Sequence, residues 1–135
     1  MYKKKLGLVL KNCQINSSGI RGIVDGSLAD MKRTDRLAVV TAVDEVISNI
    51  VKHVCRNSKG DLKIDIYQSR KRLKIVIEDS NRPFDPTQIQ SQSYDEIIDK
   101  EIEGHLGLRI IHKVMDRIKY RRLKDKNRLV LEKMI

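Results

Sequence analysis

The chain has 135 residues, a length that suits one compact domain with a buried core. Hydrophobic residues make up 40% of it and are mostly Leu, Ile and Val, which excludes a wholly disordered chain. No apolar run approaches the roughly 18 residues that a membrane-spanning helix needs, and the two cysteines form no CxxC pair. We therefore expect a cytoplasmic protein without a membrane partner, folded as a single domain over residues 1–135.

The net charge of +10, from 28 Lys and Arg against 18 Asp and Glu, raises the possibility of nucleic-acid binding. The charges are unevenly distributed, because acids gather in residues 78–103 and bases in residues 115–135. Aromatic residues, which stack on bases, are scarce: the chain has four Tyr, one Phe and no Trp. We expect the bases to form a solvated sheet face and expect no direct nucleic-acid partner.

The first part of the chain predicts one strand and two helices. Apolar residues alternate over residues 6–10, which predicts a strand. They recur at helical spacing over residues 20–31 and again over residues 35–56, where Thr34 and Asp35 offer N-caps for a long helix.

The second part predicts two hairpins separated by a loop and a helix. Alternating segments at 62–67 and 73–78 predict an antiparallel hairpin, and residues 118–134 predict another. Residues 79–104 contain both prolines and no sustained period, so they predict a long loop before a helix at 105–116. Because strands and helices do not alternate, we expect an α+β two-layer sandwich whose mixed, mostly antiparallel sheet is backed by helices.

Three places in the chain could carry chemistry, and the first is on the long helix. Glu45, Asn49 and His53 follow each other at intervals of four residues, which predicts a polar stripe along one side. A carboxylate there could act as a general base, and an amide oxygen one turn further on could bind a hard cation. Taken alone, the spacing is more typical of an ordinary solvated helix face, because polar helix faces are the norm.

The second place is the segment from Glu78 to Pro86, which includes Asp79 and comes directly after a predicted strand. A carboxylate just past a strand end can accept a hydrogen bond from an exocyclic amine, as adenine recognition requires. In the alternative interpretation, this is a proline-rich turn in which Phe84 anchors the core.

The third place is the sequence from Gly104 to Leu108, which opens the helix after the long loop. Glycines let a backbone approach phosphate closely, and a helix N-terminus supplies free N–H groups. Two glycines at a helix start are also consistent with a simple cap.

Taken in order, these three segments resemble one family. Residues 44–49 with His53 resemble the N-box of the anti-sigma-factor serine kinases, a branch of the histidine-kinase-like ATPases. Residues 79–86 resemble the first glycine box of that branch in its Pro-Phe-Asp-Pro variant, and residues 104–108 resemble the second. The resemblance covers the whole chain from about residue 5.

The resemblance implies that ATP is held between the helices, with residues 85–104 acting as a lid. It implies that Glu45 is the catalytic base that activates a serine hydroxyl, that Asn49 carries Mg²⁺, and that Asp79 accepts the adenine amine. Further nucleotide contacts are implied for His53, Asn81, Phe84, Gly104, His105, Leu106, Gly107 and Leu108. The implied partners are a STAS-type anti-anti-sigma protein, which is the substrate, and a sigma factor, with a homodimer possible.

The sequence departs from the family pattern in three places. Asn81 stands where the family has glycine after the adenine-binding aspartate, and His105 replaces a glycine of the second box. Residues 101–103 include two acids where a basic residue is usual. An alternative function therefore stays open: a regulatory module of the same fold that sequesters a protein partner without kinase activity.

Overall fold

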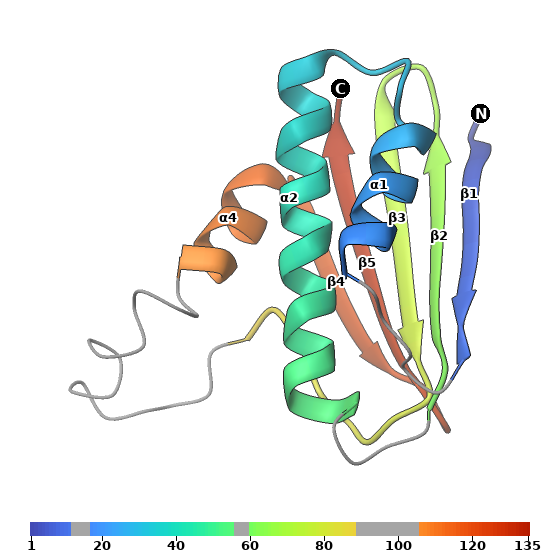
Figure 1. Cartoon of the computed structure of the whole chain (residues 1–135), viewed down its shortest axis with the longest axis vertical. Helices are drawn as coiled ribbons and strands as arrows, with labels where there is room; N and C mark the ends of the chain where they lie inside the picture. The colour runs from blue at the N-terminus through green and yellow to red at the C-terminus, as the bar shows by residue number, and fades with distance from the viewer. Residues whose placement is uncertain (12–16, 56–59, 89–105) are drawn as a thin grey trace.

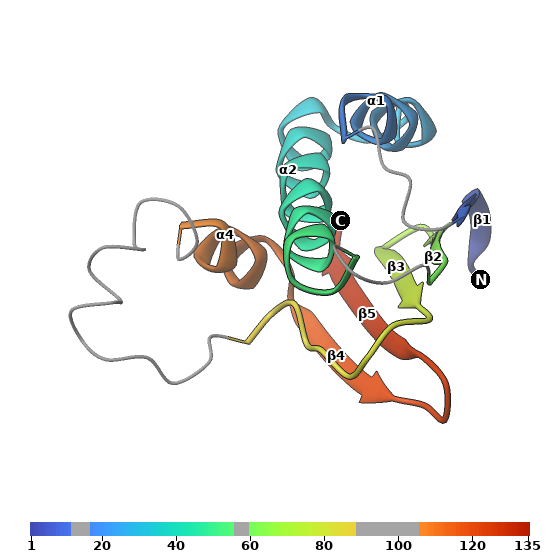
Figure 2. The ribbon, with the colours of Figure 1, turned by 60° about the horizontal axis from the view of Figure 1, so that its bottom comes forward.

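A computed structural model describes residues 1–11, 17–55, 60–88 and 106–135 of the chain. Five strands in these residues form one sheet in the order β1-β2-β3-β5-β4, and all neighbouring strands are antiparallel. The strands are β1 (Lys3–Leu10), β2 (Leu62–Gln68), β3 (Arg72–Asp79), β4 (Arg117–Arg122) and β5 (Asn127–Met134). The helices are α1 (Ser17–Ser27), α2 (Arg33–Ile50), which continues into the π-helical turn η2 (Val51–Cys55), and α4 (Leu106–Val114). All of them lie on one face of the sheet (Figures 1 and 2).

The α+β prediction is confirmed, and so are the two predicted hairpins. The pairs β2–β3 and β4–β5 are antiparallel because short turns join them, which only antiparallel pairs allow. The remaining neighbours, β1–β2 and β3–β5, are also antiparallel although longer segments connect them. Residues 89–104 of the predicted long loop lie outside the described residues.

The helix α2 lies along the sheet on its β5 and β4 side, between α1 and α4 (Figure 1). Its buried residues recur three and four positions apart, which places them in one stripe toward the strands. These residues are Val39, Val40, Ala42, Val43, Val46, Ile47 and Ile50. They meet the apolar inner side of the sheet and form one core with it.

The predicted N-caps of α2 are wrong. The N-cap is Lys32, whose backbone is extended (φ −54°, ψ 134°) and whose side chain makes no capping hydrogen bond. The preceding turn is fixed by the buried Met31, whose N–H donates to the Leu28 carbonyl, so the helix begins before Thr34. Asp35 lies in the first turn instead, where a carboxylate complements the positive end of the helix dipole.

The register of the sheet places several polar residues on the helix side at one end. Asp79 pairs with Leu62 on one side and with Asn127 on the other, and Asn127 pairs with Arg122. Side chains in a paired row point to the same face, and Leu62 faces the core, so this row points toward the helices. The end of β3 lies at the same end of the molecule as the C-terminal part of α2 (Figure 1). The first glycine box and the predicted polar stripe are therefore brought together.

Candidate functional site

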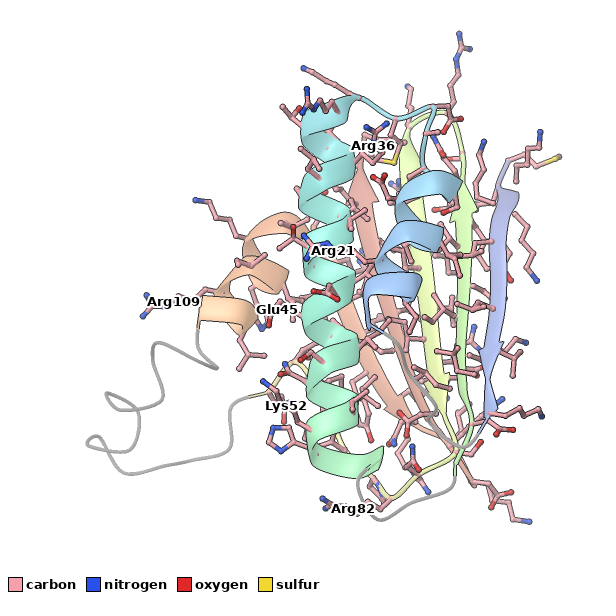
Figure 3. All side chains as sticks on the ribbon, in the orientation of Figure 1. Arg21, Arg36, Glu45, Lys52, Arg82 and Arg109 are labelled. Carbon is pink, nitrogen blue, oxygen red and sulfur yellow. The ribbon has the colours of Figure 1, made fainter. Side chains whose placement is uncertain are left out.

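Glu45 of α2 lies directly against Gly107 in the first turn of α4. A Cβ atom built on Gly107 would stand only 2.7 Å from Cδ of Glu45 and still closer to its Oε2. Figure 3 shows Glu45 on the side of α2 that faces α4. The absence of a side chain at Gly107 thus gives the Glu45 carboxylate room to approach the start of α4. The first and third predicted places meet at this contact.

One turn further along α2, Asn49 contacts the segment that follows β3. Its Nδ2 donates a hydrogen bond to the Pro86 carbonyl at 3.2 Å. This bond uses the amide nitrogen and leaves Oδ1, a hard oxygen, as the acceptor end of the same group. An amide oxygen is among the ligands that Mg²⁺ prefers, so Asn49 fits such an ion.

His53 meets Phe84 of the same segment. The two rings are stacked, with centroids 5.1 Å apart and planes 30° from parallel. Nη2 of Arg82 donates to the His53 carbonyl at 2.5 Å, which satisfies a carbonyl in the π-helical turn. Phe84 also packs against the hydrophobic core, so the anchoring role considered for it is present alongside the contact with His53.

Asp79 is buried at the end of β3, with 3% of its surface exposed. Its Oδ1 accepts hydrogen bonds from Nδ2 of Asn127 at 2.9 Å and from the backbone N–H of Asn81 at 3.2 Å. Burial raises the pKa of the Asp79 carboxyl above its usual value, although the bond from Asn127 and those from Asn81 oppose that rise. The site thus holds a desolvated carboxyl in a fixed orientation.

Asn81, which replaces the family's glycine, is buried in the turn after β3. Its side chain packs against Gly60, where a Cβ atom would also stand 2.7 Å from the Ser80 carbonyl oxygen. The Asn81 carbonyl accepts a hydrogen bond from Nη1 of Arg122 at 2.7 Å. The asparagine is therefore accommodated by close packing against Gly60.

Sequence reasoning missed a second set of contacts to the segment after β3. Nε2 of His112, on α4, donates to the Thr87 carbonyl at 3.1 Å. The hydroxyl and the N–H of Thr87 both donate to Oδ1 of Asp85, at 2.6 and 2.9 Å. These residues line a cavity of about 510 Å³. The segment is therefore held by a side chain from α2 and by one from α4, a convergence that no local pattern in the sequence signals.

Part of the second glycine box lies outside the described residues. This applies to Gly104, His105, the acidic residues at 101–103 and the side chain of Leu106. Gly107 is buried and Leu108 packs against the core. Of the proposed lid over 85–104, the structure describes residues 85–88. Within the described residues, no helix is both long and apolar enough to cross a bilayer.

The histidine kinase-like ATPase domain family matches residues 19–133. Because the match covers most of the chain, the protein belongs to this family, and the resemblance inferred from the sequence is confirmed. Membership in this family implies a nucleotide-binding function.

Curated relatives narrow the comparison to protein kinases. The chain is 28% identical over 97 residues to the serine/threonine-protein kinase BtrW of Bordetella bronchiseptica. The aligned residues make up 71% of this chain and 68% of BtrW. It is 36% identical over 83 residues to the serine-protein kinase RsbW of Staphylococcus aureus. This alignment covers 57% of this chain and 52% of RsbW. The chain thus spans about half the length of the S. aureus relative.

Proposed function

We propose that this protein is an anti-sigma-factor-type serine kinase that binds Mg·ATP and phosphorylates a STAS-type anti-anti-sigma partner. The contact between Glu45 and Gly107 carries the proposal, because it sets a carboxylate beside the start of a helix whose glycines suit phosphate. The names of the relatives, both protein kinases, support the same reaction class. Phosphorylation of the partner controls whether the kinase sequesters a sigma factor.

Each residue has a stated role in this proposal. Glu45 accepts the proton of the serine hydroxyl. The serine oxygen attacks the terminal phosphorus of ATP, and the bond between that phosphorus and the oxygen of the leaving ADP breaks. Asn49 holds Mg²⁺ through Oδ1, and the ion, when bound, neutralises phosphate charge. Asp79 accepts a hydrogen bond from the adenine amine. Backbone N–H groups of residues 104–108 bind the phosphates, and residues 85–104 act as the lid.

A calorimetric titration with Mg·ATP and Mg·ADP tests nucleotide binding first. At 100 times its Kd, a bound nucleotide adds about 2.7 kcal/mol to the free energy of unfolding, which thermal unfolding detects. Asp79→Ala should abolish the binding. Absence of binding to the wild-type protein at millimolar nucleotide would contradict the proposal.

Phosphoryl transfer is tested separately, with γ-labelled ATP and STAS-type proteins from the same organism as substrates. Glu45→Gln should abolish transfer and leave nucleotide binding largely intact, since the base acts only in the chemical step. The matched control is Asp35→Asn, which removes a carboxylate from the first turn of the same helix and should transfer at the wild-type rate. Transfer by Glu45→Gln at that rate would rule out a base at this position.

A second candidate function is a regulatory module of the same fold that sequesters a partner without kinase activity. The observation that favours it is the burial of Asn81, whose side chain fills a turn where the family has glycine. This candidate predicts partner binding by a wild-type protein that shows neither nucleotide binding nor transfer.

A further inference from the structure

Asn127, at the start of β5, is the centre of the buried polar row at the end of the sheet. It is 2% exposed and is paired directly with Asp79 of β3 and with Arg122 of β4. No motif in the sequence marks it, because it reads as part of the turn between the last two strands. Its hydrogen bonds, however, connect both neighbouring strands to the segment after β3.

The hydrogen bonds of Asn127 use both ends of its amide. Nδ2 donates to Oδ1 of Asp79 at 2.9 Å and to the Arg82 carbonyl at 2.8 Å. Oδ1 accepts from three donors, which are the Tyr120 hydroxyl at 2.5 Å, the Phe84 N–H at 3.1 Å and Nη1 of Arg122 at 3.3 Å. A reversed amide would set its oxygen against a carboxylate and a carbonyl and its NH₂ against three donors, so the partners fix the orientation.

The fixed orientation of the Asn127 amide places a hydrogen-bond donor against the Asp79 carboxylate. Oδ1 of Asp79 accepts hydrogen bonds from Nδ2 of Asn127 and from the Asn81 N–H, and the side chain of Asn81 also hydrogen-bonds to this carboxyl. Burial raises the pKa of Asp79, and the bond from Asn127 is the largest effect that opposes the rise, so the donor at Asn127 favours the ionised, accepting form.

We propose that Asn127 is a positioning residue of the nucleotide site, which holds Asp79 as a hydrogen-bond acceptor and thereby selects a 6-aminopurine over a 6-oxopurine. The inference rests on the proposed function, in which Asp79 receives the base. An amino group donates to an ionised carboxylate, whereas an oxo group places a second acceptor against it. Loss of the donor at position 127 favours the protonated carboxyl of Asp79, which can donate to a 6-oxo group. The selectivity for the 6-amino group therefore falls.

The test compares the affinities of Mg·ATP and Mg·ITP, which differ at the 6-position of the purine, by calorimetry. Asn127→Asp keeps the size and the accepting oxygen of the side chain and removes its donor. In this variant, the preference for ATP over ITP should be lower than in the wild type by about tenfold or more, because hydrogen bonds to charged groups are among the strong ones. A purely structural defect would weaken both nucleotides equally.

A second variant covers the case in which Asn127→Asp does not fold. Tyr120→Phe removes the hydroxyl that holds Oδ1 of Asn127 and should lower the ATP preference by a smaller factor. Its matched control is Tyr67→Phe, which removes a hydroxyl from the half-buried Tyr67 of β2 and should leave the preference unchanged. An unchanged preference in Asn127→Asp, or in Tyr120→Phe if that is the variant that folds, would overturn the inference.

A measurement without nucleotide separates failure of this inference from failure of the proposed function. NMR titration of the carboxyl carbons should show a higher apparent pKa for Asp79 in Asn127→Asp than in the wild type, because two adjacent carboxyls share a proton. If the wild-type protein binds neither nucleotide, the proposed function fails while this titration still judges the role of Asn127. If it binds both equally well, the selectivity is wrong although a nucleotide site exists.

Discussion

The Glu45 carboxylate and Gly107 are packed so closely that the glycine cannot carry a side chain without displacing the carboxylate. The two residues stand far apart in the sequence, on α2 and on α4, and these two helices pack against each other. The position of the proposed base is therefore coupled to the position of the helix that opens the second glycine box. A substitution at either residue should therefore change the position of the other.

Gly107→Ala should displace Glu45 rather than unfold the protein. The atoms nearest to the new methyl group belong to the end of the Glu45 side chain, which can rotate away at little cost. We expect the free energy of unfolding to change by less than about 1 kcal/mol while phosphoryl transfer is lost. Urea unfolding and the labelled-ATP assay measure the two effects. Wild-type transfer by a folded Gly107→Ala would contradict the proposed link between this contact and catalysis.

Gly60→Ala should behave differently, because the added methyl group would meet a backbone atom as well as a side chain. The added methyl group would stand 2.7 Å from the Ser80 carbonyl oxygen, which cannot rotate away. We expect a loss of about 1–3 kcal/mol, as in other overpacked sites. Gly22→Ala in α1 is the control, since it meets nothing within 4 Å and should stabilise the helix by about 0.5–1 kcal/mol. Equal unfolding midpoints in urea for the two variants would show that the contact at Gly60 is not restrictive.

Asp79 should make stability depend on pH in a sense unusual for a carboxylate. Burial raises its pKa in the folded protein above the ordinary value of 3.8, so the folded state binds this proton more tightly. The contribution of Asp79 to the free energy of unfolding must then fall as the pH rises between the unfolded and folded pKa values. The difference between the wild type and Asp79→Asn in urea unfolding should decrease over that window and level off above it.

Asp30 provides the control with the opposite sign. A hydrogen bond from Lys5 lowers the pKa of this exposed carboxyl, so its small contribution to stability is lost as the pH falls. The difference between the wild type and Asp30→Asn should therefore increase with pH. A rising difference for Asp79→Asn as well would mean that its carboxyl is not desolvated.

The stacked rings of His53 and Phe84 should be energetically coupled. A double-mutant cycle with His53→Ala and Phe84→Ala should give a coupling energy near 0.5 kcal/mol, at the low end for aromatic pairs because His53 is exposed. The bond from Arg82 goes to the His53 backbone and survives both substitutions. Additive losses in urea unfolding would show that the two rings act independently.

Local patterns in the sequence were sufficient to predict most elements of the fold. Period-two alternation located the strands of both hairpins, and the apolar stripe located α2, because each pattern follows from the geometry of its own element. The start of α2 was misplaced at Thr34 and Asp35, since a buried Met31 in the preceding turn decides where the helix begins. The last turn is π-helical rather than α-helical, which no pattern indicated.

The order and the residue types of the site, from Glu45 and Asn49 to Asp79 and Gly107, can be read from the chain before any fold is known. Which residues meet depends on the packed fold, which brings together Glu45 with Gly107, Asn49 with Pro86, and Asp79 with Asn127. The last pair depends on the register between β3 and β5, strands far apart in the chain. Pairing between such strands is set by burial of their common apolar face, which is a property of the whole sheet and not of either segment.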